Sequence, residues 1–241
     1  MRRIAYLIVV AACCGAIAQS SAAASQDYAD NPNPVLFPKQ AQPYGADMAT
    51  WGERVAQWIY AQPLAHNPLF DQTGADCAVG QQGPVWFIPP IAGPRVFSGS
   101  RTCTIPHGKA ILLALGFDVE DYPCPAFPGF QPPPGESLYD FLSGIAQTVM
   151  NSVNLLDVSL DGQPFSDVLG YRFSSDDLLT ITGDTSLQVF DPCITGSPQS
   201  AVVDGFFMMF KPLDRGAHTI LVHGTNTFGA DKTFAYHLTV E

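Results

Sequence analysis

The chain has few basic side chains. Its 241 residues include 11 Lys and Arg against 22 Asp and Glu, which gives a formal net charge of −11. Nucleic acid and anionic membrane surfaces repel acidic proteins, so the composition argues against both as partners. Glutamate is scarce, with four Glu beside 18 Asp. Aspartate favours turns, and this bias therefore fits a loop-rich β protein, with cation binding as the alternative reading.

Several catalytic and metal-binding signatures are also absent. The chain has no Gly-x-Ser-x-Gly turn, no Cys-x-x-Cys pair and no His-Glu-x-x-His. An α/β-hydrolase, a thioredoxin-like redox protein and a zinc protein of the usual kinds are therefore disfavoured. His218 and His223 lie an odd number of residues apart, so on a strand they would point to opposite faces. No catalytic residue can be assigned from motifs.

One long apolar run is present, and it begins the chain. A basic start, Met1-Arg2-Arg3, precedes the almost uncharged stretch 4–18 and small residues up to Ala24. This layout predicts a signal peptide at 1–24 and a secreted or periplasmic protein with no integral membrane segment after cleavage. Val10-Ala-Ala-Cys13 also matches the sequence before a lipidated cysteine, so a lipoprotein attached through Cys13 is the alternative.

Four cysteines follow the leader, namely Cys77, Cys103, Cys124 and Cys193. An even number in an exported chain predicts two disulfides. Three pairings are possible. We favour Cys77–Cys103, which brackets an apparent hairpin, and Cys124–Cys193, which ties the middle of the chain to its last third.

The remaining pattern predicts one mainly β domain over residues 47–241. Residues 25–46 are polar and proline-rich, which indicates an extended N-terminal arm. A helix should begin near Asp47, where Thr50-Trp-Gly-Glu53 has capping-box spacing, and a second helix should cover about 136–151. Six prolines predict a surface loop at 121–135. Short strands elsewhere suggest an antiparallel β-sandwich or jelly roll with two short helices, stapled by the two disulfides.

A set of landmarks along the chain resembles a group of uncharacterised secreted bacterial proteins. These are the tryptophan-rich helix, Gly80-Gln-x-Gly-Pro-Val-Trp-Phe87, Arg101-x-Cys-x-Ile-Pro-x-Gly-Lys-Ala110, His218-Thr-Ile220 and Tyr236-His-Leu-Thr-Val240. The resemblance covers most of the chain beyond the leader. It implies a bacterial origin and export, and it supplies no activity.

The densest acidic cluster is formed by Asp118, Glu120 and Asp121. Asp118 and Glu120 would share one face at a strand end, where two carboxylates can bind Ca²⁺ or supply the acid and base of glycoside cleavage. Charges at a strand end also discourage edge pairing, which is the structural alternative. Aromatic side chains bind sugar rings, so Tyr122 and Trp86 join the candidate ligand-binding residues, although a buried Trp86 is the other reading.

These observations favour a secreted, non-enzymatic β-sandwich protein that binds an extracellular glycan or an envelope protein. No cofactor is indicated apart from calcium, for which Asp118 and Glu120 are the candidate ligands. One alternative is an extracellular polysaccharide hydrolase with a carboxylate pair. The other is a structural surface protein, for which an unpaired edge strand or a donor arm would be the sign.

Overall fold

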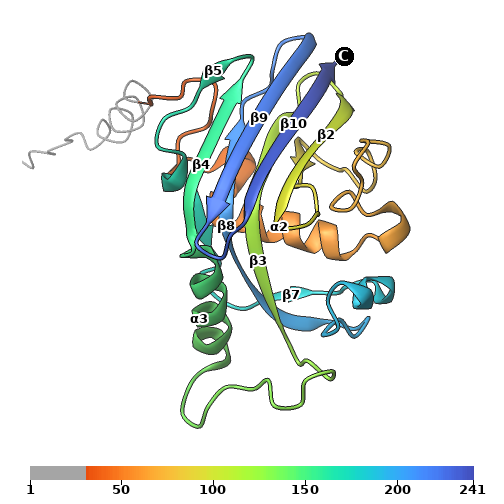
Figure 1. Ribbon diagram of the computed structural model, residues 1–241, viewed down its shortest axis with the longest axis vertical. Coiled ribbons are helices and arrows are strands. Elements are labelled where there is room, and N and C mark those ends of the chain that lie inside the picture. The colour runs from red at the N-terminus through yellow and green to blue at the C-terminus, as the bar shows by residue number, and fades with distance from the viewer. Residues whose placement is uncertain (1–30) are drawn as a thin grey trace, which may run out of the picture. The chain divides into compact units, whose positions relative to one another are not determined.

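Two five-stranded sheets pack face to face in the computed structural model, which describes residues 31–241 (Figure 1). The predicted signal peptide 1–24 and Cys13 lie outside the described residues. The first sheet has the strand order β1-β3-β8-β6, and β7 also pairs with β8. The second sheet has the order β2-β10-β9-β4-β5. The mainly β class and the sandwich are therefore confirmed.

The strands of the first sheet are β1 (Val85–Ile88), β3 (Ala110–Tyr122), β6 (Arg172–Ser174), β7 (Leu179–Ile181) and β8 (Gln199–Phe210). Those of the second are β2 (Val96–Ile105), β4 (Val153–Leu160), β5 (Gln163–Pro164), β9 (Gly216–Asn226) and β10 (Asp231–Val240). The α-helices are α2 (Met48–Tyr60) and α3 (Leu138–Met150), and the 3₁₀ turns are η1 (Pro43–Gly45), η2 (Leu64–His66), η3 (Val168–Gly170) and η4 (Thr185–Val189).

Two of the strand pairs are parallel, which corrects the purely antiparallel arrangement expected from the sequence. β1 pairs in parallel with β3, and β2 pairs in parallel with β10. A parallel pair needs a crossover connection, and β2 of the second sheet supplies one between β1 and β3. The expected hairpin around Cys77 and Cys103 is therefore a crossover between the two sheets.

The main core lies between the sheets. Along β10 the side chains of Phe234, Tyr236, Leu238 and Val240 are buried, and the intervening residues are more exposed. This period of two places one face of the strand against the first sheet. The opposite face of the first sheet packs on α2, and its buried residues form a second cluster.

Helix α2 begins where the sequence predicts, but its cap differs. The Asp47 side chain accepts a hydrogen bond from the Thr50 amide at 2.8 Å, so Asp47 is the N-cap and Thr50 lies in the first turn. Trp51, Val55 and Trp58 are buried on the face that packs on the first sheet. Among residues 31–241 no helix has both the length and the hydropathy required to cross a membrane.

Both predicted disulfides are confirmed, Cys77–Cys103 and Cys124–Cys193. The second anchors the proline-rich segment, which begins after Tyr122 because β3 includes Asp121 and Tyr122. This segment leads into α3, whose Leu142 and Ala146 pack against Val202 of β8. Helix α3 therefore covers the end of the first sheet that the second sheet leaves uncovered (Figure 1).

Residues from Pro32 onward belong to one compact unit, including much of the expected arm. Leu36 is fully buried and forms a β-bridge to Phe210 at the end of β8. Asn33 donates a hydrogen bond to the Ser166 carbonyl at 3.0 Å. Residues 32–46 are thus packed onto the sandwich, because apolar side chains in this polar stretch find places in the core.

Candidate functional site

The candidate site follows the part of β3 that extends past its neighbour β1. β1 pairs only with residues 110–113, whereas β8 pairs with β3 as far as Tyr122. A β-bulge between Ala114 and Gly116 shifts the register at the point where β1 ends. Beyond the bulge, β3 has a paired neighbour on one side only among the described strands. Bulges bend a strand and redirect its side chains, which is common beside functional sites.

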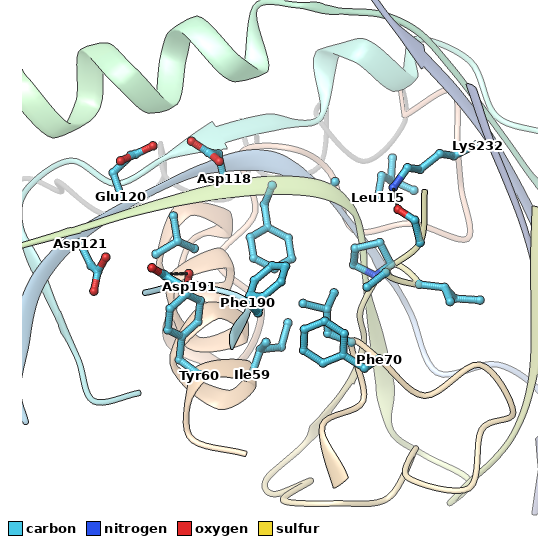
Figure 2. A pocket seen from close by; sticks show the side chains of 18 of the residues that line it. Ile59, Tyr60, Phe70, Leu115, Asp118, Glu120, Asp121, Phe190, Asp191 and Lys232 are labelled. Atoms are coloured by element: carbon cyan, nitrogen blue, oxygen red, sulfur yellow. Dashed lines mark hydrogen bonds between the residues drawn. The ribbon is translucent and has the colours of Figure 1, made fainter. Parts of the chain in front are cut away.

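A cleft of about 800 Å³ follows this edge of β3 (Figure 2). Its walls come from α2, from the segment after β1, from the loop after η4 and from the start of β10. Its acidic residues are Asp118, Glu120, Asp121 and Asp191, and its aromatic residues are Tyr60, Phe70, Phe117, Phe190 and Phe234. The cleft thus combines an acidic edge with an aromatic wall.

Asp118 and Glu120 lie on one face of β3, as the sequence predicts, and Figure 2 shows both carboxyl groups on the same side of the strand. Burial raises the pKa of Asp118 to about 6, a hydrogen bond with Glu120 opposes this shift, and the charge of Asp204 adds to it. Burial and the charge of Asp118 raise the pKa of Glu120 to about 8. Oδ2 of Asp118 is buried and has no hydrogen-bond partner among the described residues. The two carboxyl groups therefore compete for a proton near neutral pH.

Asp121 lies on the opposite face of β3, because it is one residue from Glu120 (Figure 2). Its carboxylate accepts a hydrogen bond from the Gln199 side chain at 2.7 Å. Burial and the nearby charge of Asp191 raise the pKa of Asp121 to about 7. The three predicted carboxyl groups thus border one cleft from both faces of its edge strand.

Asp191 also lines the cleft, and no motif in the sequence marks it as a site residue. Its carboxylate accepts hydrogen bonds from the Tyr60 hydroxyl at 3.1 Å and from the Cys193 amide at 3.0 Å. The Cys124–Cys193 disulfide attaches this loop to the segment that follows β3. The nearest sequence signal was its position two residues before a predicted disulfide cysteine, which did not indicate which strand the loop approaches.

The aromatic wall contains a pair of phenylalanine rings, of which Phe70 is half-buried and Phe190 exposed. The rings of Phe70 and Phe190 are 5.0 Å apart between centroids and lie edge to face. Phe190 is 53% exposed, so a large apolar surface beside the carboxyl groups is open to a ligand. An aromatic face of this kind stacks on apolar or sugar surfaces.

Two predicted ligand-binding residues do not line the cleft. Trp86 is buried in the core between the sheets, and its Nε1 has no hydrogen-bond partner among the described residues. Tyr122 packs with the cluster around Leu142 of α3. The pleat and the sheet pairing place both rings against other buried side chains. For Trp86 this agrees with the alternative expectation of a buried core residue.

The cleft does not offer a complete calcium site. Carboxylate oxygens of Asp121 and Asp191 lie within 4.8 Å of each other and of the Cys193 sulfur. That sulfur is in a disulfide, and both carboxylates already accept hydrogen bonds. Calcium takes about six to eight oxygen ligands, so these two carboxylates would supply only part of its coordination shell. The predicted candidates Asp118 and Glu120 are not part of this group.

Comparisons with known proteins leave the function open. No protein-family model matches the chain, and no curated protein matches it. Among solved structures, a solution structure of amebosin is similar over 62% of this chain and 100% of that chain, with 13% sequence identity and a TM-score of 0.20. A match at that TM-score carries no argument about fold or function.

Proposed function

We propose that the chain is a secreted, non-enzymatic protein that binds an extracellular glycan in the cleft along β3. The observation that carries the proposal is the meeting of Asp118, Glu120 and Asp121 with the Phe70–Phe190 pair around one cavity. Ligand sites characteristically combine an apolar wall with a few convergent polar groups. Export is supported by the leader in the sequence and by the two disulfides, which persist in oxidising compartments.

The protonation of the carboxyl groups suits a ligand rich in hydroxyl groups. Because the pKa values of Asp118, Asp121 and Glu120 are raised to between about 6 and 8, protonated and ionised groups coexist near neutral pH. A protonated carboxyl group donates a hydrogen bond and an ionised one accepts, and a sugar hydroxyl does both. An apolar sugar face would lie against Phe190, whose ring is exposed beside these groups.

The alternative is a hydrolase that uses the Asp118–Glu120 pair. The elevated pKa of Glu120 favours this residue as the proton donor. We favour binding because Asp118 and Glu120 lie two residues apart on the same face of one strand, whereas the two carboxyl groups of a glycosidase flank the scissile bond.

A glycan array followed by titration of the best oligosaccharide tests the proposal. Because Gln keeps hydrogen-bonding capacity, Glu120→Gln should weaken binding by about tenfold or less, and no cleavage product should form with the parent protein. Glu136→Gln, an exposed site outside the cleft, is the matched control. Release of shorter sugars that stops in Glu120→Gln would establish the hydrolase. If no glycan on the array binds, the proposal of a glycan ligand is rejected. If EDTA abolishes binding, calcium is required for it.

A further inference from the structure

A second cavity, of about 260 Å³, lies between the two sheets. Its lining includes residues from the end of α3, the start of β4 and the β9–β10 turn. Figure 1 shows these elements at the same end of the second sheet. Its apolar lining consists mainly of Leu115, Phe117, Val149, Met150, Val153 and Phe206. Among the described residues that line it, only Lys232 carries a charge.

A glycine in β3 leaves part of this space open. Gly116 pairs with Phe206 and lines the cavity, and a Cβ atom added to Gly116 would meet no atom within 4 Å. Gly224 of β9 lines the cavity from the facing sheet, but a Cβ atom added there would lie 2.9 Å from Cδ2 of Leu156. The cavity is therefore a place where the sequence leaves the sandwich unfilled.

Lys232 lies at a position on β10 where the alternation of buried and exposed residues predicts a core side chain. It is two residues before the buried Phe234, so its side chain shares the inward face. Its Nζ donates a hydrogen bond to the Gly93 carbonyl at 3.2 Å, and none of the ion pairs among the described residues includes it. Burial lowers the pKa of Lys232, and no carboxylate offsets that shift.

Lys232 lies where the two cavities meet. Lys232, Leu115, Gly116, Phe117 and Phe234 line both this cavity and the larger cleft. Gly93, whose carbonyl accepts the hydrogen bond from Nζ of Lys232, lines the larger cleft, and Figure 2 shows Lys232 beside Leu115 at one end of that cleft. This inference does not depend on the glycan proposal, because the acidic residues of the cleft do not line the inner cavity.

We propose that the inner cavity binds a medium-chain fatty acid, with the aliphatic tail between the sheets and the carboxylate on Lys232. Burial of a hydrocarbon tail among Leu115, Met150 and Phe206 contributes a favourable free energy of binding that is proportional to the apolar area removed from water. An ammonium group without an acidic partner supplies a charge-assisted hydrogen bond to the carboxylate. The volume of about 260 Å³ lies just below the usual range of ligand pockets, about 300 to 1,000 Å³, which excludes long-chain fatty acids.

Titration of the whole protein with octanoate, octan-1-ol and octylamine tests the charge and the tail separately. We expect octanoate to bind about tenfold or more tightly than octan-1-ol, and octylamine not to bind. Lys232→Met keeps the apolar stem and should remove the preference for octanoate over octan-1-ol. Lys109→Met is the matched control, because Nζ of Lys109 also donates to a glycine carbonyl, that of Gly83, away from the cavity.

A second variant tests the location. Gly116→Leu places a side chain in the cavity and should abolish binding of both octanoate and octan-1-ol, with thermal unfolding confirming that the variant folds. If Gly116→Leu does not fold, the Lys232→Met result decides. The proposal is overturned if octanoate does not bind, if Lys232→Met binds it as tightly as the parent protein, or if a folded Gly116→Leu retains binding.

Discussion

Arg172 holds the buried carboxylate of Asp204 through two hydrogen bonds, Nε to Oδ1 at 2.8 Å and Nη2 to Oδ2 at 2.6 Å. This pair joins β6 to β8, and Asp204 is directly opposite Asp118 in the sheet. The charge of Asp204 contributes to the raised pKa of Asp118. One ion pair therefore links the stability of the first sheet to the electrostatics of the cleft.

Arg172→Leu should destabilise the protein by about 3–5 kcal/mol, because it leaves the Asp204 carboxylate buried without its partner. Chemical denaturation measures the loss. Arg215→Leu, at an exposed position, should change the free energy of unfolding by no more than about 0.5 kcal/mol. Equal effects of the two substitutions would contradict the assignment.

The free energy of unfolding should fall as the pH rises from about 4 to about 8. In this range the folded chain keeps protons on Asp118, Asp121 and Glu120, whose pKa values are about 6, 7 and 8 against ordinary values of 3.8 and 4.5. The folded state then binds more protons than the unfolded state, so stability is lost with increasing pH.

Glu120→Gln should reduce that slope and gain stability over the parent protein at the upper end of the range, because the amide cannot ionise. Denaturation curves measured at several pH values give the slopes. Glu136→Gln, whose carboxylate is exposed, should leave the slope unchanged. An unchanged slope in Glu120→Gln would show that Glu120 ionises normally in the folded chain.

The two disulfides should differ in their contribution to the free energy of unfolding. Cys124–Cys193 closes a separation of 69 residues and Cys77–Cys103 one of 26. In the chain-entropy description these loops correspond to about 4.4 and about 3.5 kcal/mol. Replacing both cysteines of a pair by Ala should therefore cost more stability for Cys124 and Cys193. The opposite order in urea denaturation would contradict this expectation.

Gly144→Ala should stabilise the protein by about 0.5–1 kcal/mol. Gly144 is exposed within α3, and a Cβ atom there would meet no atom within 4 Å. Gly52→Ala in α2 is the matched comparison, because its Cβ would lie 2.7 Å from the Phe207 ring and should destabilise. Thermal unfolding of the two variants should give shifts of opposite sign, and shifts of the same sign would contradict the packing described for α2.

Local pattern was sufficient for much of the fold. The spacing of Trp51, Val55 and Trp58 predicted α2, and the proline-rich run at 121–135 predicted the surface loop that follows β3. Both disulfides followed from counting the cysteines and comparing the chain segments that they would close. These features depend on periodicities and residue preferences that act over a few neighbouring positions.

The pairing of strands that are distant in the sequence could not be predicted from such local patterns. Nothing near Val85 or Ala110 indicates that β1 and β3 are parallel, because the pairing depends on β2 crossing to the other sheet. The same holds for Asp191, which reaches Asp121 only after the chain has passed through α3 and several strands.

The sequence alone determined the acidic composition, the even number of cysteines after residue 24 and the shared face of Asp118 and Glu120, since strand alternation is a local property. The tertiary structure decided that β3 extends past β1, that Phe190 and Asp191 lie beside it, and that a cavity lies between the sheets next to Gly116 and Lys232. Cavities and raised pKa values arise from burial by distant segments, and burial is set only when the sheets pack.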